Sequence, residues 1–190
     1  MTLPAAAPHR QLKHRRQFDV QVFSRGDGFW EVDAVLIDTK TRDAKLGSGL
    51  RPAGTPIHEM QLRLVVDEKL VIHEAGSETR WMPYTPQCGE HGDAYARLVG
   101  LSLARGFRKH LLEKLGGVLG CTHLTELAQV LPTAVIQAFA GEVIDTKGDG
   151  DVRPYQIDRC HALRRGGPVV QTYYPRWYHA AAVNEQDANT

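Results

Sequence analysis

FWEVDAVLIDTK, residues 29–40, is the stretch that determines the fold class. Its apolar side chains alternate with polar ones and face one way: Trp30, Val32, Ala34 and Leu36. Such alternation predicts a β-strand with one buried face. The preceding stretch QFDVQVFSR, residues 17–25, alternates in the same way, and turn-forming residues at 25–28 join the two. We therefore predict a β-hairpin over this part of the chain.

Two further stretches extend the predicted sheet. IHEMQLRLVVDE, residues 57–68, alternates again, and LVIHE, residues 70–74, pairs back across a short turn. The front half therefore predicts an antiparallel meander of about four strands. Residues 39–56 are polar and rich in Gly and Pro, which predicts a long loop that acts as a lid or a binding segment.

The middle of the chain changes to a helical period. Residues 91–117 predict two short helices divided near Gly106. From Cys121 the apolar pattern predicts a longer helix to Ile136, kinked or restarted at Pro132.

The last part of the chain returns to a pattern that predicts strands. YQIDRCHALR, residues 155–164, and PVVQTYY, residues 168–174, predict a C-terminal hairpin. The expected fold class is α+β: an antiparallel sheet, made of the N-terminal meander plus the C-terminal hairpin, with two to four helices packed on one face. We expect residues 1–16 to form a flexible arm, 17–180 one domain and 181–190 a polar tail.

Composition narrows the class of partner. The chain has 190 residues, of which 23 are Lys or Arg and 22 are Asp or Glu. This balance disfavours nucleic acid as the main partner, because phosphate binding needs a basic excess. No apolar run is long enough for a membrane span, and the start lacks a secretory core. The three cysteines are an odd number and do not suggest a set of disulfide bonds, so we expect reduced thiols in a cytoplasmic protein.

Cys121 and His123 stand where a glycine-rich loop becomes a helix. Three interpretations remain open. In the catalytic one, backbone N–H groups at the helix start favour the thiolate of Cys121, His123 acts as base, and Glu126 holds its tautomer. In the metal-binding one, Cys88 and His91 join Cys121 and His123 around zinc. In the third, Cys121 is simply a buried structural thiol.

His58 lies on the apolar face of its strand, where an imidazole needs a partner or a cavity. It is either a core residue bonded to the backbone or the general acid or base of a cavity between sheet and helices. In the second case we expect it to lie mostly buried and within about 10 Å of Cys121. Asp38 ends the neighbouring strand on the same face and joins the catalytic candidates. The expected substrate contacts are Lys40, Arg51, Met60 and Tyr84.

Three short motifs, GTPIHEM, GCTHLTEL and YYPRWYH, resemble a bacterial family known as domain of unknown function 2889. The resemblance extends from about Phe18 to Tyr178. The positions that match are His58, Met60, Gly120, Cys121, His123 and Glu126, followed by Asp38, Cys88 and Cys160. His91 and His161 depart from the pattern, which weakens the zinc half-site at Cys88. The family implies a shared site and no particular reaction.

Two functional hypotheses follow. The first is a small enzyme of lyase or hydrolase type that acts on a small organic acid or acyl substrate. It needs no nucleotide cofactor, because the chain has no glycine-rich phosphate loop. The second is a non-catalytic ligand- or zinc-binding module or accessory subunit. Neither hypothesis involves a membrane, and both leave a homo-oligomer open.

Overall fold

The computed structural model describes residues 2–90 and 92–180, apart from the side chains of residues 92 and 93. Two compact units are present, one reaching to Ile136 and the other beginning at Gln137. Each is described separately. None of the described helices is long and apolar enough to cross a membrane.

The first unit is built on a four-stranded antiparallel sheet in the order β1-β2-β5-β6. The strands are β1 (His14–Ser24), β2 (Phe29–Lys40), β5 (Pro56–Asp67) and β6 (Ile72–Trp81). The predicted meander is confirmed. β1 begins at His14, so its first three residues belong to the sheet and not to the expected arm.

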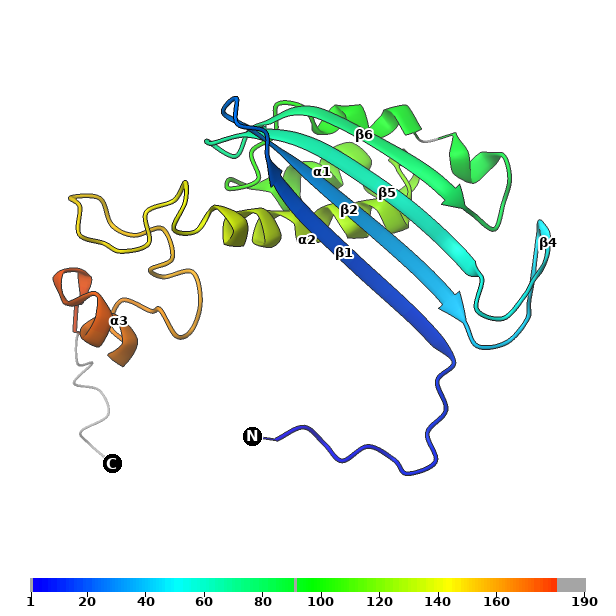
Figure 1. The fold of residues 1–190 in the computed structure, drawn as a ribbon, viewed down its shortest axis with the longest axis horizontal. Helices are drawn as coiled ribbons and strands as arrows, with labels where there is room; N and C mark the ends of the chain where they lie inside the picture. The colour runs from blue at the N-terminus through cyan, green and yellow to red at the C-terminus, as the bar shows by residue number, and fades with distance from the viewer. Residues whose placement is uncertain (1, 91, 181–190) are drawn as a thin grey trace. The chain divides into compact units, whose positions relative to one another are not determined.

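Helices cover one face of this sheet, and the other is open (Figure 1). The main covering helices are α1 (Phe107–Leu115) and α2 (Thr122–Phe139). The inward side chains of β2 are buried, as their alternation predicted, and leucines on α1 and α2 fill the layer between. The α+β class, with helices on one face, is therefore confirmed.

Two helix predictions are refined. The first short helix is a 3-10 helix, η2 (Gly92–Leu98), and the second is α1. α2 continues through Pro132 as one helix. Proline at this position removes one backbone hydrogen-bond donor from the helix interior.

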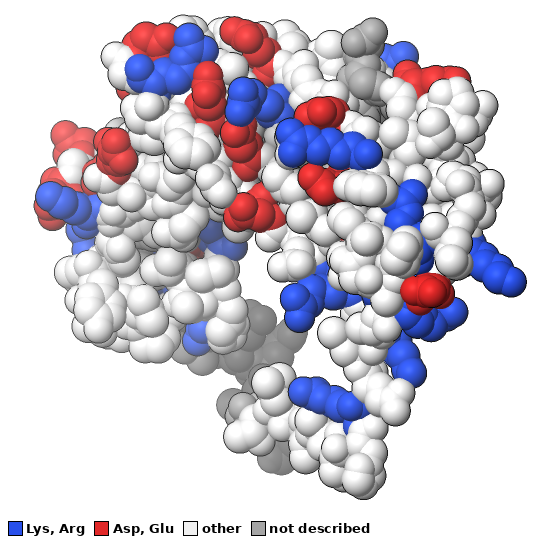
Figure 2. Space-filling view, turned by 45° about the vertical axis from the view of Figure 1, so that its right-hand side comes forward, with Lys and Arg blue, Asp and Glu red and all other residues white. Residues whose placement is uncertain are grey.

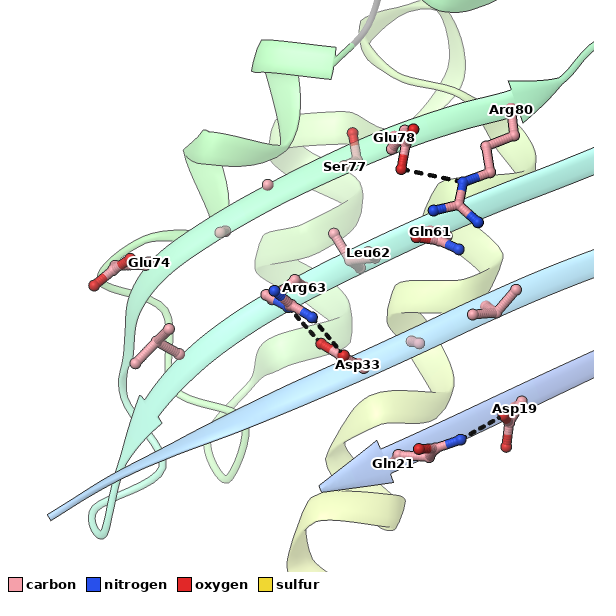
Figure 3. A pocket seen from close by; sticks show the side chains of 15 residues that line it. Asp19, Gln21, Asp33, Gln61, Leu62, Arg63, Glu74, Ser77, Glu78 and Arg80 are labelled. Carbon is pink, nitrogen blue, oxygen red and sulfur yellow. Dashed lines mark hydrogen bonds and ion pairs between the residues drawn. The ribbon is translucent and has the colours of Figure 1, made fainter. Parts of the chain in front are cut away.

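Mixed charges line the open face of the sheet. Arg63 forms two hydrogen bonds with Asp33, and Arg80 bonds Glu78 two residues away on β6. These side chains line a hollow of about 720 Å³ (Figure 3). Acidic and basic side chains are interspersed in the space-filling view (Figure 2). The alternation of β2 and β5 thus separates an apolar face from a solvated one.

The long loop at 39–56 has its own structure. It contains a small hairpin of β3 (Ala44–Leu46) and β4 (Gly49–Arg51). The N–H of Ser48 donates to the carbonyl of Pro83, at 3.2 Å, which ties the hairpin to the segment after β6.

The predicted C-terminal hairpin is wrong. In its place the second unit has turns, the helix α3 (Pro168–Tyr173) and the 3-10 helix η4 (Pro175–Trp177). Gly167 caps α3 and Pro168 starts it, a combination that favours a helix start over a strand. The β-branched pair after Pro168 had suggested a strand. The expected polar tail, 181–190, lies outside the described residues.

Candidate functional site

Asp38 and His58 face each other across β2 and β5, on the side that the helices cover. They are direct partners in the strand register, and the register shifts immediately after Asp38. Nδ1 of His58 lies 3.0 Å from Oδ2 of Asp38. A carboxylate can only accept, so Nδ1 carries the hydrogen of this bond.

Asp38 is buried to 1% exposure, yet it is fully partnered. Arg16, its register partner on β1, donates to both carboxylate oxygens at 2.8 and 2.7 Å. Nε2 of His14 lies 3.1 Å from Oδ1. Burial opposes ionisation, but the hydrogen bonds and charge of Arg16, together with His58, outweigh it and lower the pKa of Asp38. Asp38 is therefore ionised at neutral pH.

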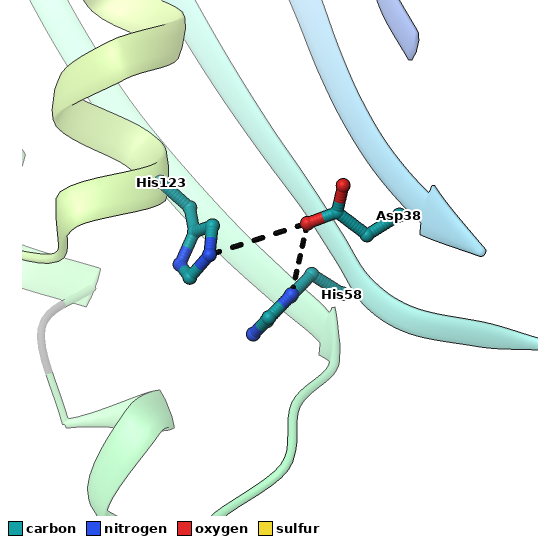
Figure 4. Close-up of side chains that lie close together, drawn as sticks. All are labelled: Asp38, His58 and His123. Atoms are coloured by element: carbon teal, nitrogen blue, oxygen red, sulfur yellow. Dashed lines mark hydrogen bonds and ion pairs between the residues drawn. The ribbon is translucent and has the colours of Figure 1, made fainter. Parts of the chain in front are cut away.

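His123, from the first turn of α2, completes a compact group with these residues. Its ring lies against that of His58, with centroids 3.9 Å apart and planes tilted by 31°. Its Nε2 is 4.0 Å from Oδ2 of Asp38 (Figure 4). Burial lowers the pKa of both imidazoles below 6.5, and Asp38 only partly offsets this. Both rings are accordingly neutral at pH 7.

Cys121 stands just before α2, as the catalytic interpretation requires. Its carbonyl accepts the N–H of Thr125 at 2.9 Å, and its own N–H donates to the hydroxyl of Tyr95 at 3.1 Å. Its Sγ lies 3.9 Å from Nδ1 of His123 and 3.8 Å from the sulfur of Met60. The thiol therefore touches both His123 and the core residue Met60.

Gly120 allows the chain to enter α2 at this place. A Cβ there would lie 2.7 Å from the carbonyl oxygen of Leu115 and 3.2 Å from the hydroxyl of Tyr95. Real Cβ atoms essentially never come so close to backbone, so the helix start would have to move.

We expect Gly120→Ala to lower the free energy of unfolding by about 1–3 kcal/mol, because the added methyl overpacks a tight contact. Gly76→Ala is the matched control: Gly76 lies in β6 with nothing within 4 Å of an added Cβ, so no loss is expected. Denaturant unfolding of both variants measures the difference. Equal stability of the two would contradict the tight fit at Gly120.

A cavity of about 580 Å³ opens beside His123. Its described lining comes from the segment after β6 and from the start of α2: Pro83, Tyr84, Gln87, Cys88, Cys121, Thr122 and His123. Two of the predicted catalytic residues and one predicted substrate contact thus line one cavity.

The remaining predicted residues are not among the described lining of this cavity. Glu126, which was expected to hold the tautomer of His123, forms an ion pair with Arg16, and its role at His123 stays a prediction. Met60 is a core residue. Arg51 stacks on Trp81, 4.4 Å from the ring centroid, and Lys40 ends β2. Cys160 is exposed in the second unit.

Two sets of residues are suited to hold a metal ion. Cys88, Cys121 and His123, the set expected from sequence, share the cavity, while His91 lies outside the described residues. Within the described ranges, the donor atoms of Asp38, His58 and His123 lie within 4.8 Å of one another. The second set is the more compact.

Sequence reasoning missed Arg16 and His14, which it assigned to the arm. A signal was present: even-numbered residues of β1, such as Phe18, share the inward face, so Arg16 belongs to that face by parity. A strand that begins at His14 would have predicted the contact with Asp38.

Comparison with known proteins shows a family. No curated protein and no solved structure matches the chain. The sequence profile described as protein of unknown function (DUF2889) matches residues 14–137, which include every residue of the Asp38 group and the cavity. Because this match covers more than half of the chain, the protein belongs to the DUF2889 family.

Proposed function

We propose that the protein is an acid–base enzyme of lyase or hydrolase type that acts on a small organic substrate. The observation that carries the proposal is the buried Asp38–His58 pair, with His123 stacked on it at the wall of a cavity. A neutral imidazole oriented by a carboxylate is a common form of general base.

Asp38 would set the orientation and tautomer of His58. Because Nδ1 donates to Asp38, Nε2 carries no hydrogen and can accept a proton. The second ring nitrogen of His58 points away from Asp38 (Figure 4). Arg16 keeps Asp38 ionised, so the carboxylate also stabilises the imidazolium that forms.

His123 would share the proton with His58. A charge on either ring lowers the pKa of the other group, because the rings are in contact. The pair therefore favours a single proton, which one step of a reaction can take up and the next return. Cys121 lies beside His123 and contributes a polarisable sulfur atom to the lining of the cavity.

A second candidate function is binding of a divalent metal such as zinc by Asp38, His58 and His123. Their mutual distances favour it. Against it, a metal at Nδ1 of His58 would replace the hydrogen bond to Asp38, whose oxygens already hold Arg16. The acid–base reading keeps all of these bonds, and we prefer it.

Nitrogen-15 NMR of the imidazoles tests the proposal. We expect His58 to carry its hydrogen on Nδ1 and to titrate below pH 6.5, as burial lowers its pKa. His73 is an internal control, because its Nε2 bonds Asp67 at 2.9 Å and the opposite tautomer is expected. A hydrogen on Nε2 of His58 would refute the acid–base role.

Metal analysis of the purified protein tests the second candidate function. Stoichiometric zinc that is lost in His58→Gln would support it.

A further inference from the structure

The cavity beside His123 has an uncharged lining. Its seven described lining residues include no Lys, Arg, Asp or Glu. Two arginines bound to elements around the cavity are occupied: Arg16 by Asp38 and Glu126, and Arg51 by two backbone carbonyls and Trp81. A carboxylate placed in the cavity would find no free guanidinium or ammonium among these groups, and burying an unpaired charge is costly.

The lining is instead rich in polarisable groups. Tyr84 contributes an aromatic ring, Pro83 an apolar face, and Cys88 and Cys121 two sulfur atoms. Aromatic rings and sulfur make favourable contacts with a flat ring, beyond simple burial of apolar area. The volume of about 580 Å³ is within the range of small-molecule sites.

Tyr84 is exposed yet held in place. The residue is 61% exposed. One edge of its ring lies against Gly47 of the β3–β4 hairpin, so closely that a Cβ at Gly47 would be 2.9 Å from two ring carbons. Its carbonyl accepts the N–H of Cys88 at 2.9 Å. The long loop thus fixes an exposed aromatic ring at the cavity, which reduces the entropy lost on stacking.

We propose that the cavity binds an uncharged aromatic ring of the substrate, stacked on Tyr84, with a hydroxyl or ester group directed to His123. This inference rests on the proposed function, because the ring of His123, which lines the cavity, lies against the ring of His58. It narrows the expected small organic acid or acyl compound to a neutral aromatic alcohol or ester.

Binding of three probes to the whole protein tests the inference: benzyl alcohol, cyclohexylmethanol and benzoate. We expect benzyl alcohol to bind more tightly than either of the others and to shift the NMR signals of His123 and Tyr84. Tyr84→Ala should weaken its binding by about 3- to 10-fold, the usual size of an aromatic contact. Tyr173→Ala is the matched control, because Tyr173 is also an exposed tyrosine, in the second unit, and no change is expected.

Gly47→Ala gives an independent variant. It displaces the ring of Tyr84 without altering any group of the acid–base pair, and it should weaken benzyl alcohol binding in the same direction. Tightest binding of benzoate, equal binding of cyclohexylmethanol, or no effect of Tyr84→Ala would overturn the inference.

The two proposals can fail separately. His58→Gln should leave benzyl alcohol binding unchanged, because the described cavity lining includes His123 and not His58. If benzyl alcohol binds at Tyr84 but turnover does not depend on His58, the proposed function is wrong and the ligand class stands. If His58-dependent turnover exists without aromatic binding at Tyr84, the ligand class is wrong and the function stands.

Discussion

Asp38→Asn is expected to lower the free energy of unfolding by about 3 kcal/mol, the usual cost of removing one partner from a buried ion pair. Asp38 is 1% exposed and accepts hydrogen bonds from Arg16 and His58. The amide of asparagine has one acceptor and one donor group, so its NH2 must face a donor of Arg16 or His58. The variant therefore loses a charge and gains an unfavourable donor–donor contact.

Asp33→Asn is the matched control on the same strand. Asp33 also binds an arginine through both oxygens, at 2.6 and 2.7 Å from Arg63, but on the open face of the sheet. Exposed pairs of this kind contribute about 0–1 kcal/mol. Urea unfolding of the two variants compares buried and exposed pairs with the same geometry. If Asp38→Asn lowers the free energy of unfolding no more than Asp33→Asn does, then Asp38 and its buried partners do not form a cooperative unit.

The strands of the sheet could be predicted because the alternation of apolar and polar residues is visible within each short stretch of sequence. Alternation in β2 assigns Leu36 and Asp38 to one face, and the same rule places His58 on the inward side of β5. The class of fold follows from the change of period near Phe107. The C-terminal hairpin could not be decided in this way, since the residues after Pro168 fit a short strand and a short helix equally well.

The site was only partly predictable, because it depends on long-range register. The sequence indicated His58, Asp38 and His123 as separate candidates, and the structure places them together. His58 is mostly buried, with 14% of its side chain exposed, as the cavity hypothesis required. Arg16 was missed since a basic run near a terminus normally indicates a solvated arm. Parity within β1 assigns Arg16 to the inward face, and the pairing of β1 with β2 brings its guanidinium to Asp38.

His58→Gln is expected to reduce hydrolysis of 4-nitrophenyl acetate by about 100-fold or more, the usual contribution of a general base. The aromatic ring of this probe suits the uncharged cavity, and its ester would meet His123, whose ring lies against that of His58. Glutamine can still donate an amide hydrogen to Asp38, so the ion pair with Arg16 and the fold should persist. A melting curve alongside the assay separates lost chemistry from lost structure.

The pH dependence and a control variant make this result specific. The pKa of His58 lies below 6.5 because of burial, so the wild-type rate should rise with pH through that pKa and be level above pH 7. Asp38 raises the pKa of His58, so Asp38→Asn should move the rise to still lower pH. His73→Gln removes a more exposed histidine that also bonds an aspartate, and it should leave the rate unchanged. If His58→Gln and His73→Gln hydrolyse the ester equally fast, the reaction comes from surface imidazoles, and His58 is a buried partner of Asp38 without a catalytic role.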